Sequence, residues 1–274
     1  MAIEPSTMFD LQSHGADTFV GIGPRYPWGG LFGGQIVGQS LRAAAATVDV
    51  EMHVHSLRAY FIRPGDHTEP IRFEVDRIRN GRSFSTRRVV ARQAIGAILN
   101  LEASFQKPEH TADLQTVPMD PSVPKPDELA GDAWSEAFDR RSVPDGVLAD
   151  ETRTGTGRSA AWMRVTTPLT DEDLLHRCWL AYMSDDMPTH TVRQAHPDFS
   201  GTRGTEIAFA ASLDHTIWFH RPLRADEWHL YDFSCHGFIG GRGLAIGHVY
   251  AAAGTHVATV AQEVLIRDAR KEGQ

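Results

Sequence analysis

The chain contains a long internal repeat. The segment Tyr60-Phe61-Ile62-Arg63-Pro64 returns as Trp218-Phe219-His220-Arg221-Pro222, and the pair Gly81-Arg82 returns as Gly241-Arg242. The two spacings, 158 and 160 residues, are nearly equal. A unit of this length is too long for a solenoid repeat and suits a duplicated domain. We therefore expect two halves of similar fold that face each other across a seam, where a cleft can form.

Length and composition fit such a duplication. The 274 residues allow roughly 110 to 130 residues per half, enough to bury a core in each. The net charge of −8 argues against a nucleic-acid-binding protein. The first residues lack the pattern of a signal peptide, and no apolar run reaches the roughly 18 residues of a membrane span. Cys178 and Cys235 make no disulfide framework, so we expect a cytoplasmic protein without membrane contact.

Each half reads as one helix followed by four strands. Apolar residues at helical spacing predict a helix from Gln35 to Val48, begun at a glycine turn, and a second helix from Thr170. Alternating patterns predict strands at 57–61, 71–75, 83–93 and 97–105, and again at 205–222, 227–235, 242–252 and 255–267. We expect an antiparallel meander in each half. The fold class is α+β, a double hot-dog in which each curved sheet wraps one long central helix.

A proline-rich segment divides the chain. Residues 107–135 contain Pro108, Pro118, Pro121, Pro124 and Pro126 among acidic and small residues, which is typical of an extended linker. We therefore predict an N-terminal repeat at 1–106, an interdomain linker at 107–135 and a C-terminal repeat at 136–274.

Arginines crowd into the first repeat. They are Arg58, Arg63, Arg72, Arg77, Arg79, Arg82, Arg87, Arg88 and Arg92. One interpretation is a solvated strand face. The other is local attraction for a phosphorylated ligand on a protein that is otherwise acidic.

The two halves differ in their carboxylates. The first helix has none, whereas Asp185 and Asp186 lie near the end of the second. At 100° per residue both fall near the border of the apolar arc, so periodicity does not choose between them. A carboxylate against packed surface has a shifted pKa, whereas acids at a helix end can simply reach solvent. Both interpretations remain open.

Two further polar residues of the second half can join a carboxylate. Gln262 occupies the position of Ser104 in the first repeat, and Ser212 precedes Leu213-Asp214-His215. A carboxylate can accept a proton from water while a hydroxyl and a carboxamide orient that water. Such a site hydrolyses its substrate with neither a covalent nucleophile nor a metal.

Several long segments resemble the acyl-CoA thioesterase II family, whose members are double hot-dog thioesterases. They are Phe32-Gly33-Gly34-Gln35-Ile36-Val37-Gly38-Gln39, His55-Ser56-Leu57-Arg58-Ala59-Tyr60-Phe61-Ile62-Arg63-Pro64-Gly65-Asp66, Gly81-Arg82-Ser83-Phe84-Ser85-Thr86-Arg87-Arg88-Val89, Leu180-Ala181-Tyr182-Met183-Ser184-Asp185, Leu213-Asp214-His215-Thr216-Ile217-Trp218-Phe219-His220-Arg221-Pro222 and Gln262-Glu263. Together they span nearly the whole chain.

The resemblance implies a function and a site. The family's aspartate, threonine and glutamine fall on Asp185, Ser212 and Gln262, with serine in place of the usual threonine. Serine keeps the hydroxyl but lacks the methyl group that restricts χ1. The implied reaction is hydrolysis of a fatty acyl-CoA to the free fatty acid and CoA, without metal or cofactor. The resemblance also implies a homodimer or homotetramer.

The oxyanion of the reaction needs hydrogen-bond donors. Gly33 and Gly34 are candidates, because they lie at a glycine-rich helix start where backbone N–H groups are free. The Arg-rich strands are candidates for holding the nucleotide phosphates.

Two other functions are possible. Asp185, Pro188 and His190 resemble part of the signature of hot-dog enoyl-CoA hydratases, but here they follow an apolar helix instead of preceding one. A non-catalytic acyl-CoA binding protein is the third possibility. His53 and His55 lack the carboxylates or cysteines of a metal site, and His215 and His220 are expected to be structural.

Overall fold

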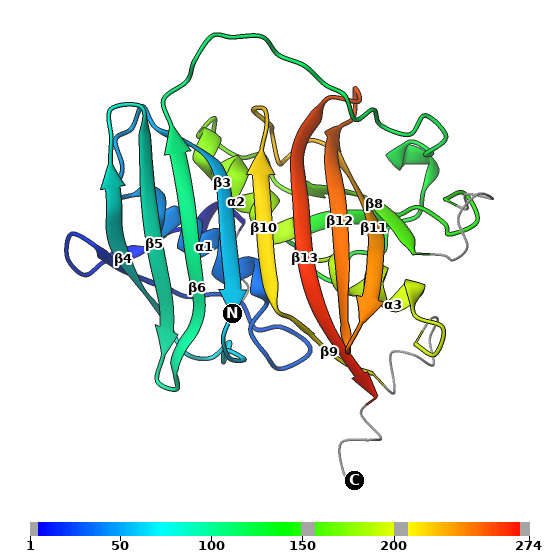
Figure 1. Cartoon of the computed structure of the whole chain (residues 1–274), viewed down its shortest axis with the longest axis horizontal. Coiled ribbons are helices and arrows are strands. Elements are labelled where there is room, and N and C mark those ends of the chain that lie inside the picture. Colours follow the sequence, from blue (N-terminus) through cyan, green and yellow to red (C-terminus); the bar gives the residue numbers. More distant parts are fainter. Residues whose placement is uncertain (1–4, 149–156, 200–207, 269–274) are drawn as a thin grey trace.

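The computed structural model describes residues 5–148, 157–199 and 208–268, whose two halves lie side by side and share one sheet (Figure 1). The first half contains η1 (Pro5–Thr7), β1 (Gln12–Ser13), β2 (Thr18–Gly21), α1 (Gly33–Ala45), β3 (His53–Phe61), β4 (Ile71–Asn80), β5 (Phe84–Gln93) and β6 (Gly96–Gln106). The second half contains η2 (Pro126–Glu128), β7 (Phe138–Ser142), β8 (Arg158–Val165), α2 (Asp173–Met183), α3 (Pro188–Ala195), β9 (Ala208–Ser212), β10 (Asp214–Phe219), β11 (His229–Ile239), β12 (Arg242–Ala251) and β13 (His256–Asp268).

The sheet follows the internal repeat. Its strand order is β1-β2-β4-β5-β6-β3-β10-β13-β12-β11-β8-β7, with β9 paired to β13. The two halves join where β3 pairs antiparallel with β10, and in that pair Arg58 lies opposite Thr216. These two residues are 158 positions apart, the same spacing that relates the two sequence motifs. The seam is therefore a local two-fold axis that exchanges β3 with β10 and β6 with β13.

The predicted meander is wrong in one connection of each half. Strands β4, β5 and β6 do follow one another, but β3 pairs with β6 and not with β4. In the same way β10 pairs with β13. An alternating pattern shows which face of a strand is buried but not which strand lies beside it. The consequence is that the two copies of the repeated motif meet at the seam.

The predicted strand at 205–222 is two strands. β9 pairs with β13 through Ser212 and Val264, whereas β10 pairs with β13 from Thr216 onward. Between them the N–H of Leu213 donates to Glu263 O, and Leu213 O accepts from the N–H of Phe61. Residues 205–207 of the prediction lie outside the described residues. The break at Leu213 leaves Ser212 beside the seam.

Helices α1 and α2 lie next to each other behind the sheet (Figure 1). They run antiparallel, since the start of α1 meets the end of α2. A methyl group at Gly34 would lie 2.2 Å from Tyr182 O, and one at Gly38 would lie 3.0 Å from Cys178 O. Glycines four residues apart thus let the two backbones approach closely, which explains the glycine spacing in the first helix.

Residues 107–125 contain no helix or strand and cross from β6 to the second half (Figure 1). This stretch packs on the outer face of the second half, where Val123 is buried beside Trp162 and Tyr250. Trp162 Nε1–H donates to Pro124 O at 2.8 Å. The segment therefore holds a fixed path against β8 and β12, while the boundaries 1–106, 107–135 and 136–274 stay a prediction.

The described residues contain no helix that is both long and apolar enough to cross a bilayer. Cys178 and Cys235 are both free thiols. Burial raises the pKa of Cys178 to about 12, so this thiol is unreactive at neutral pH.

Candidate active site

Asp185 lies in a turn and not on the helix that precedes it. Helix α2 ends at Met183, Ser184 is its C-terminal cap, and Asp186 N–H donates to Met183 O at 3.1 Å. Neither aspartate is part of the helix, so the helical rotation of 100° per residue does not give the direction of its side chain. Both carboxylates turn inward, and Asp185 is only 8% exposed. The alternative that these acids reach solvent is wrong.

Asp185 faces the start of α1, which belongs to the other repeat. Its carboxylate accepts a hydrogen bond from the N–H of Gly34. A methyl group at Gly33 would lie 2.6 Å from Asp185 Oδ2 and 2.9 Å from the ring of Phe61. The carboxylate of one half thus lies against the helix N-terminus of the other, where the helix dipole favours negative charge.

The three predicted catalytic side chains are in contact with one another. Gln262 Nε2–H donates to Ser212 Oγ at 2.7 Å, and Ser212 Oγ–H donates to Asp185 Oδ1 at 3.4 Å. Gln262 is fully buried on β13, and Ser212 is the last residue of β9. Two adjacent strands and the turn after α2 therefore bring a carboxylate, a hydroxyl and a carboxamide to one point.

Burial sets the protonation of this carboxylate. It raises the pKa of Asp185 to about 7, with a smaller contribution from the negative charge of Asp186. Hydrogen bonds from Gln262, Gly34 and Ser212 act in the opposite direction. A carboxyl group with a pKa near neutrality can exchange a proton with water, which an ordinary exposed aspartate does poorly.

His215, which the sequence led us to expect as a structural residue, contacts the predicted site residue Gln262. Its Nδ1 lies 2.5 Å from Gln262 Oε1, and its Nε2 lies 2.9 Å from Ser184 Oγ. An amide oxygen only accepts, so Nδ1 carries the proton and Nε2 accepts from the serine. Burial lowers the pKa of His215 to about 4, which keeps the ring neutral. His215 thereby fixes the orientation of the Gln262 amide and turns its NH2 group toward Ser212.

A sequence signal for His215 exists in the strand alternation. His215 and Ile217 are buried on β10, whereas Trp218 is exposed on the opposite face. A histidine on the inward face of a strand needs a polar partner, and Gln262 on the neighbouring strand has the same requirement. The pairing of β10 with β13 was needed to bring the two together.

Asp186 has a different environment. Its carboxylate forms an ion pair with Arg140 Nε at 2.9 Å and accepts from Trp134 Nε1–H at 2.5 Å. It thereby ties the turn after α2 to β7 and to the segment before it. The structure thus separates two neighbouring acids that periodicity could not distinguish.

An aromatic cluster lies beside the two aspartates. It consists of Tyr26, Trp28, Phe32, Trp134, Phe138 and Tyr182. The rings of Phe32 and Tyr182 are 4.9 Å apart between centroids, and those of Trp28 and Trp134 are also 4.9 Å apart. Residues of both repeats contribute, so the apolar surface next to Asp185 spans the boundary between them.

The arginines of the first repeat mostly pair with carboxylates. Ion pairs join Arg58 to Asp214, Arg72 and Arg92 to Glu74, Arg77 to Asp17 and Arg88 to Asp76. These pairs favour the solvated strand face for five of the nine. Arg63 donates instead to Ala97 O, and Arg87 is buried.

The rings of His53, His55 and His190 have hydrogen-bond partners other than Asp185. His190 is on α3, and its ring contacts Arg193 and Gln194 of the same helix. His55 contacts Ser104 at 2.8 Å, and His53 contacts Asp173 at 3.2 Å. Within residues 5–148, 157–199 and 208–268, no group of three or more His, Cys, Asp or Glu side chains is arranged to hold a metal ion.

Two family models match the chain in succession. The acyl-CoA thioesterase N-terminal domain matches residues 23–106, and the acyl-CoA thioesterase C-terminal domain matches residues 111–266. The first contains Gly33 and Gly34, and the second contains Asp185, Ser212 and Gln262.

Known proteins of similar sequence or structure agree with this assignment. The chain is 37% identical to acyl-coenzyme A thioesterase 8 of Mus musculus over 265 residues, 86% of this chain and 80% of the relative. An acyl-CoA thioesterase II of Mycobacterium marinum is 38% identical, with a TM-score of 0.86 over 98% of both chains. A hot-dog protein of Alicyclobacillus acidocaldarius, only 20% identical, has a TM-score of 0.77 over 96% of this chain and 97% of its own, which confirms the fold. The chain belongs to the acyl-CoA thioesterase II family.

Proposed function

We propose that the protein hydrolyses fatty acyl-CoA to the free fatty acid and CoA, with Asp185 as the general base. Family membership supports the reaction class. The observation that supports the site most strongly is the buried Asp185 carboxylate, whose pKa of about 7 suits proton exchange with water. Its contacts with Ser212 and the start of α1 supply the remaining groups that the reaction needs.

The proposed chemistry uses one water molecule. Asp185 takes a proton from water as the water oxygen attacks the thioester carbon. Ser212 and the Gln262 carboxamide orient that water, and His215 holds the carboxamide in place. The tetrahedral intermediate collapses with cleavage of the C–S bond, and protonated Asp185 returns the proton to the departing CoA thiolate. Atoms and charge balance without an acyl-enzyme, a metal or a cofactor.

Gly33 is our candidate donor to the oxyanion. The N–H of Gly34 is already engaged by the Asp185 carboxylate. Gly33 is the first residue of α1, where backbone N–H groups have no partner inside the helix. A carbonyl oxygen held there develops its negative charge at the positive end of the helix dipole. The N–H of Gly34 would then hold the Asp185 base, and the N–H of Gly33 would hold the oxyanion.

The aromatic cluster beside Asp185 is the proposed acyl site. Trp28, which is half exposed, and Trp134 offer apolar surface above the buried rings of Phe32 and Tyr182. Trp134 bonds to Asp186, the residue after the reacting carboxylate. Burying an acyl chain there is worth about 0.8 kcal/mol per CH2 group.

Assembly and location are further parts of the proposal. The first residues of the two repeated motifs, Tyr60 and Trp218, are both exposed on the outer face of the sheet beside the seam. Exposed aromatic side chains at a local two-fold axis suit a contact between copies of the chain, as a homodimer or homotetramer. Free cysteine thiols are in keeping with a cytoplasmic location. Analytical ultracentrifugation of wild type and Trp218→Glu tests the assembly.

The direct test is an assay of free CoA release from acyl-CoAs of short, medium and long chains. We expect hydrolysis of at least one class, and no hydration of the matching trans-2-enoyl-CoA. Hydration without hydrolysis would support the hydratase alternative, with Asp185 and His190 as its candidates. Tight binding of acyl-CoA without turnover would support the non-catalytic alternative.

A further inference from the structure

A cavity lies at the end of the helix pair away from Asp185. Its volume is about 760 Å³, within the range of ligand sites. It is formed by the end of α1, the start of α2 and the first residues of β3, including Ala45, Glu172 and Val54. Along α1 it is roughly 18 Å from Gly33, at 1.5 Å per residue. It is therefore separate from the proposed active site.

The local two-fold axis makes this cavity the counterpart of the active site. Asp185 lies near the start of α1, past the end of α2, and next to the start of β10 and to β13. Exchange of the two repeats replaces these elements by the start of α2, the end of α1, the start of β3 and β6. The lining of the cavity contains one residue at or next to each of these four places, in the same order: Glu172, Ala46, Met52 and Phe105. The local two-fold axis thus relates the place of this cavity to the place of the proposed site around Asp185.

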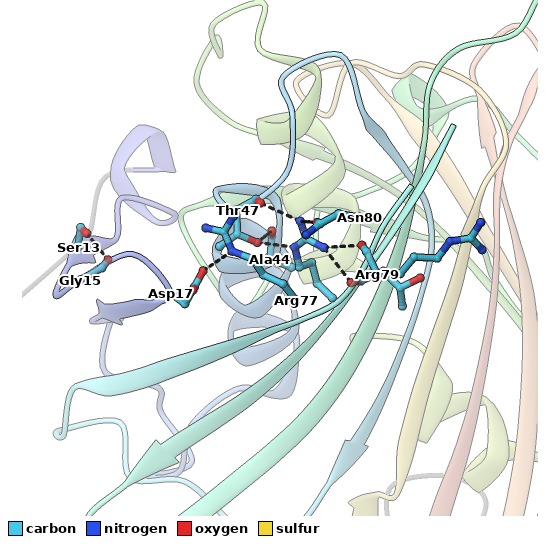
Figure 2. Close-up of polar contacts among 10 residues, drawn as sticks. Ser13, Gly15, Asp17, Ala44, Thr47, Arg77, Arg79 and Asn80 are labelled. Atoms are coloured by element: carbon cyan, nitrogen blue, oxygen red, sulfur yellow. Dashed lines mark hydrogen bonds and ion pairs between the residues drawn. The ribbon is translucent and has the colours of Figure 1, made fainter. Parts of the chain in front are cut away.

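The counterpart lacks the groups that would activate water. Asp185 is the second residue after the end of α2, and the second residue after the end of α1 is Thr47. The Thr47 hydroxyl donates to Ala44 O at 2.8 Å and accepts from Arg87 Nε–H at 2.7 Å (Figure 2). The position of Gln262 is held by Ser104, which bonds to His55. A ligand bound here meets no general base at the corresponding place.

The inner wall of the cavity is apolar. Four buried residues form it: Phe9, Phe19, Val54 and Phe105. Arg42 pairs with Glu172 and Arg177 with Asp173 at the start of α2, so these charges are largely matched among themselves. Asp10 and Asp49 also line the cavity, while the inner wall of Phe9, Phe19, Val54 and Phe105 favours a hydrocarbon chain.

A basic cavity of about 630 Å³ adjoins the first. The two share Ala46, Val48, Asp49 and Met52, and the basic one is also lined by Arg77, Arg82, Arg87 and Lys107. Arg77 pairs with Asp17 and Lys107 with Glu51. Within the described part of the chain, Arg82 has no carboxylate partner.

Arg87 is the most unusual member of this basic cavity. It is only 1% exposed, and its five hydrogen bonds all end on neutral oxygens, those of Thr47, Asn80, Thr86 and Arg79 (Figure 2). A buried guanidinium ion normally has an anion as its partner. These bonds use all five N–H groups of Arg87, so its attraction for phosphate groups in the adjoining cavity would come from its charge alone.

We propose that the two adjoining cavities form a second, non-hydrolytic site for acyl-CoA. The acyl chain lies against Phe9, Phe19 and Phe105, and the phosphates of CoA lie near Arg82 and Arg87. The proposal rests on the proposed function, because it takes its ligand from the symmetry with the active site. An apolar cavity beside a basic one fits an anionic amphiphile of this class.

The test is isothermal titration of the full chain with S-octyl-CoA, a thioether that cannot be hydrolysed. We expect two equivalents per chain in wild type and in Asp185→Asn. Arg82→Glu, a change in an exposed turn, should weaken one of them about tenfold or more, since it replaces an attraction for phosphate by a repulsion. Lys125→Glu has the same change of charge on the linker and should leave both equivalents intact. Ala46→Trp, in the wall shared by the two cavities, should remove the same equivalent that Arg82→Glu weakens.

A single equivalent that is unaffected by Arg82→Glu and Ala46→Trp would overturn the second site. A single equivalent lost in Arg82→Glu together with hydrolysis would also overturn it, because the basic cavity would then serve the active site. Full hydrolysis by Asp185→Asn would refute the proposed function instead, while two equivalents in the titration would stand. The two failures are therefore distinguishable.

Discussion

At the scale of single residues, the raised pKa of Asp185 comes from its surroundings in the fold and not from the type of side chain. Its neighbour Asp186 has the same side chain and is also buried, but Arg140 and Trp134 neutralise and hold it. Among the residues that the structure describes, no cation forms an ion pair with Asp185, and its carboxylate lies beside neutral donors. Burial without a cation raises the pKa of a carboxyl group, as it does for Asp185. One turn thus places two acids in opposite environments.

The raised pKa of Asp185 predicts the pH dependence of both activity and stability. We expect kcat/KM to rise with pH and to level off above a midpoint of about 7, because the ionised carboxylate is the base. The folded pKa lies above the unfolded value, so the stability that this group contributes is present at low pH and is lost as the pH rises through about 7. At pH 8, Asp185→Asn should therefore be more stable than wild type, by on the order of 4 kcal/mol.

Rate profiles and thermal melts of the two proteins between pH 5 and 9 (about two units either side of the expected midpoint) check this prediction. A flat rate profile, or a variant less stable than wild type at pH 8, would contradict it.

His215 acts through Gln262 and not on the substrate. Removal of its Nδ1–H donor frees the carboxamide to rotate. We expect His215→Phe to lower kcat about tenfold, the value of one lost hydrogen bond, with little change in KM. His215→Asn keeps a donor near the position of Nδ1 and should recover part of the rate. Steady-state kinetics of both variants, with melting curves as the control for folding, tests the assignment; equal losses in the two variants would indicate a structural role only.

At the scale of elements, the sequence predicted the central helices and the strands, but not which strands pair with each other. Both central helices and the buried faces of the strands were evident from periodicity. The pairing of β3 with β6 and β10 was not, because it depends on contacts far apart in the chain. The end of α2 at Met183 was also not predicted. Apolar residues continue up to the last turn of this helix and give no signal for its end. The contact of His215 with Gln262 followed only once the strands were paired.

The helix pair gives a prediction about Gly33 and Gly34. A methyl group at Gly34 would meet Tyr182 O at 2.2 Å, so Gly34→Ala should push α1 from α2 and cost about 3 kcal/mol of stability. A methyl group at Gly33 would meet Asp185 Oδ2 at 2.6 Å instead. Gly33→Ala should therefore lower kcat about 100-fold by displacing the carboxylate, with a smaller loss of stability. Urea denaturation and kinetics on the same samples separate the two effects; the reverse ranking would show that the contacts are assigned wrongly.

At the scale of the whole molecule, the duplication supplies two related places that differ in their side chains. The place between the end of α2 and the start of α1 has Asp185, Ser212 and Gln262. The corresponding place between the end of α1 and the start of α2 has Thr47 and a cavity with a basic cavity beside it. Residues of both repeats form each place, so neither half can provide a complete site by itself.

The shared sheet predicts that the two halves unfold together. β3 pairs with β10 along five residue pairs, and α1 packs against α2 over its length. Separation of the halves would expose both surfaces at once. We expect one calorimetric transition whose van't Hoff enthalpy equals the calorimetric enthalpy. Two resolved transitions would show that the repeats are independent domains, and limited proteolysis within 107–135 would then release them as separate folded fragments.

We propose that Asp185, and not Asp186, activates the water that cleaves the thioester. The most direct measurement is kcat/KM for hydrolysis of the preferred acyl-CoA by Asp185→Asn and Asp186→Asn, purified side by side. Asn keeps the shape of the side chain and removes its basicity. We predict a loss of roughly 1,000-fold for Asp185→Asn, the contribution of a general base, and of less than about tenfold for Asp186→Asn. A folded Asp185→Asn protein that hydrolyses within about tenfold of the wild-type rate would contradict the claim.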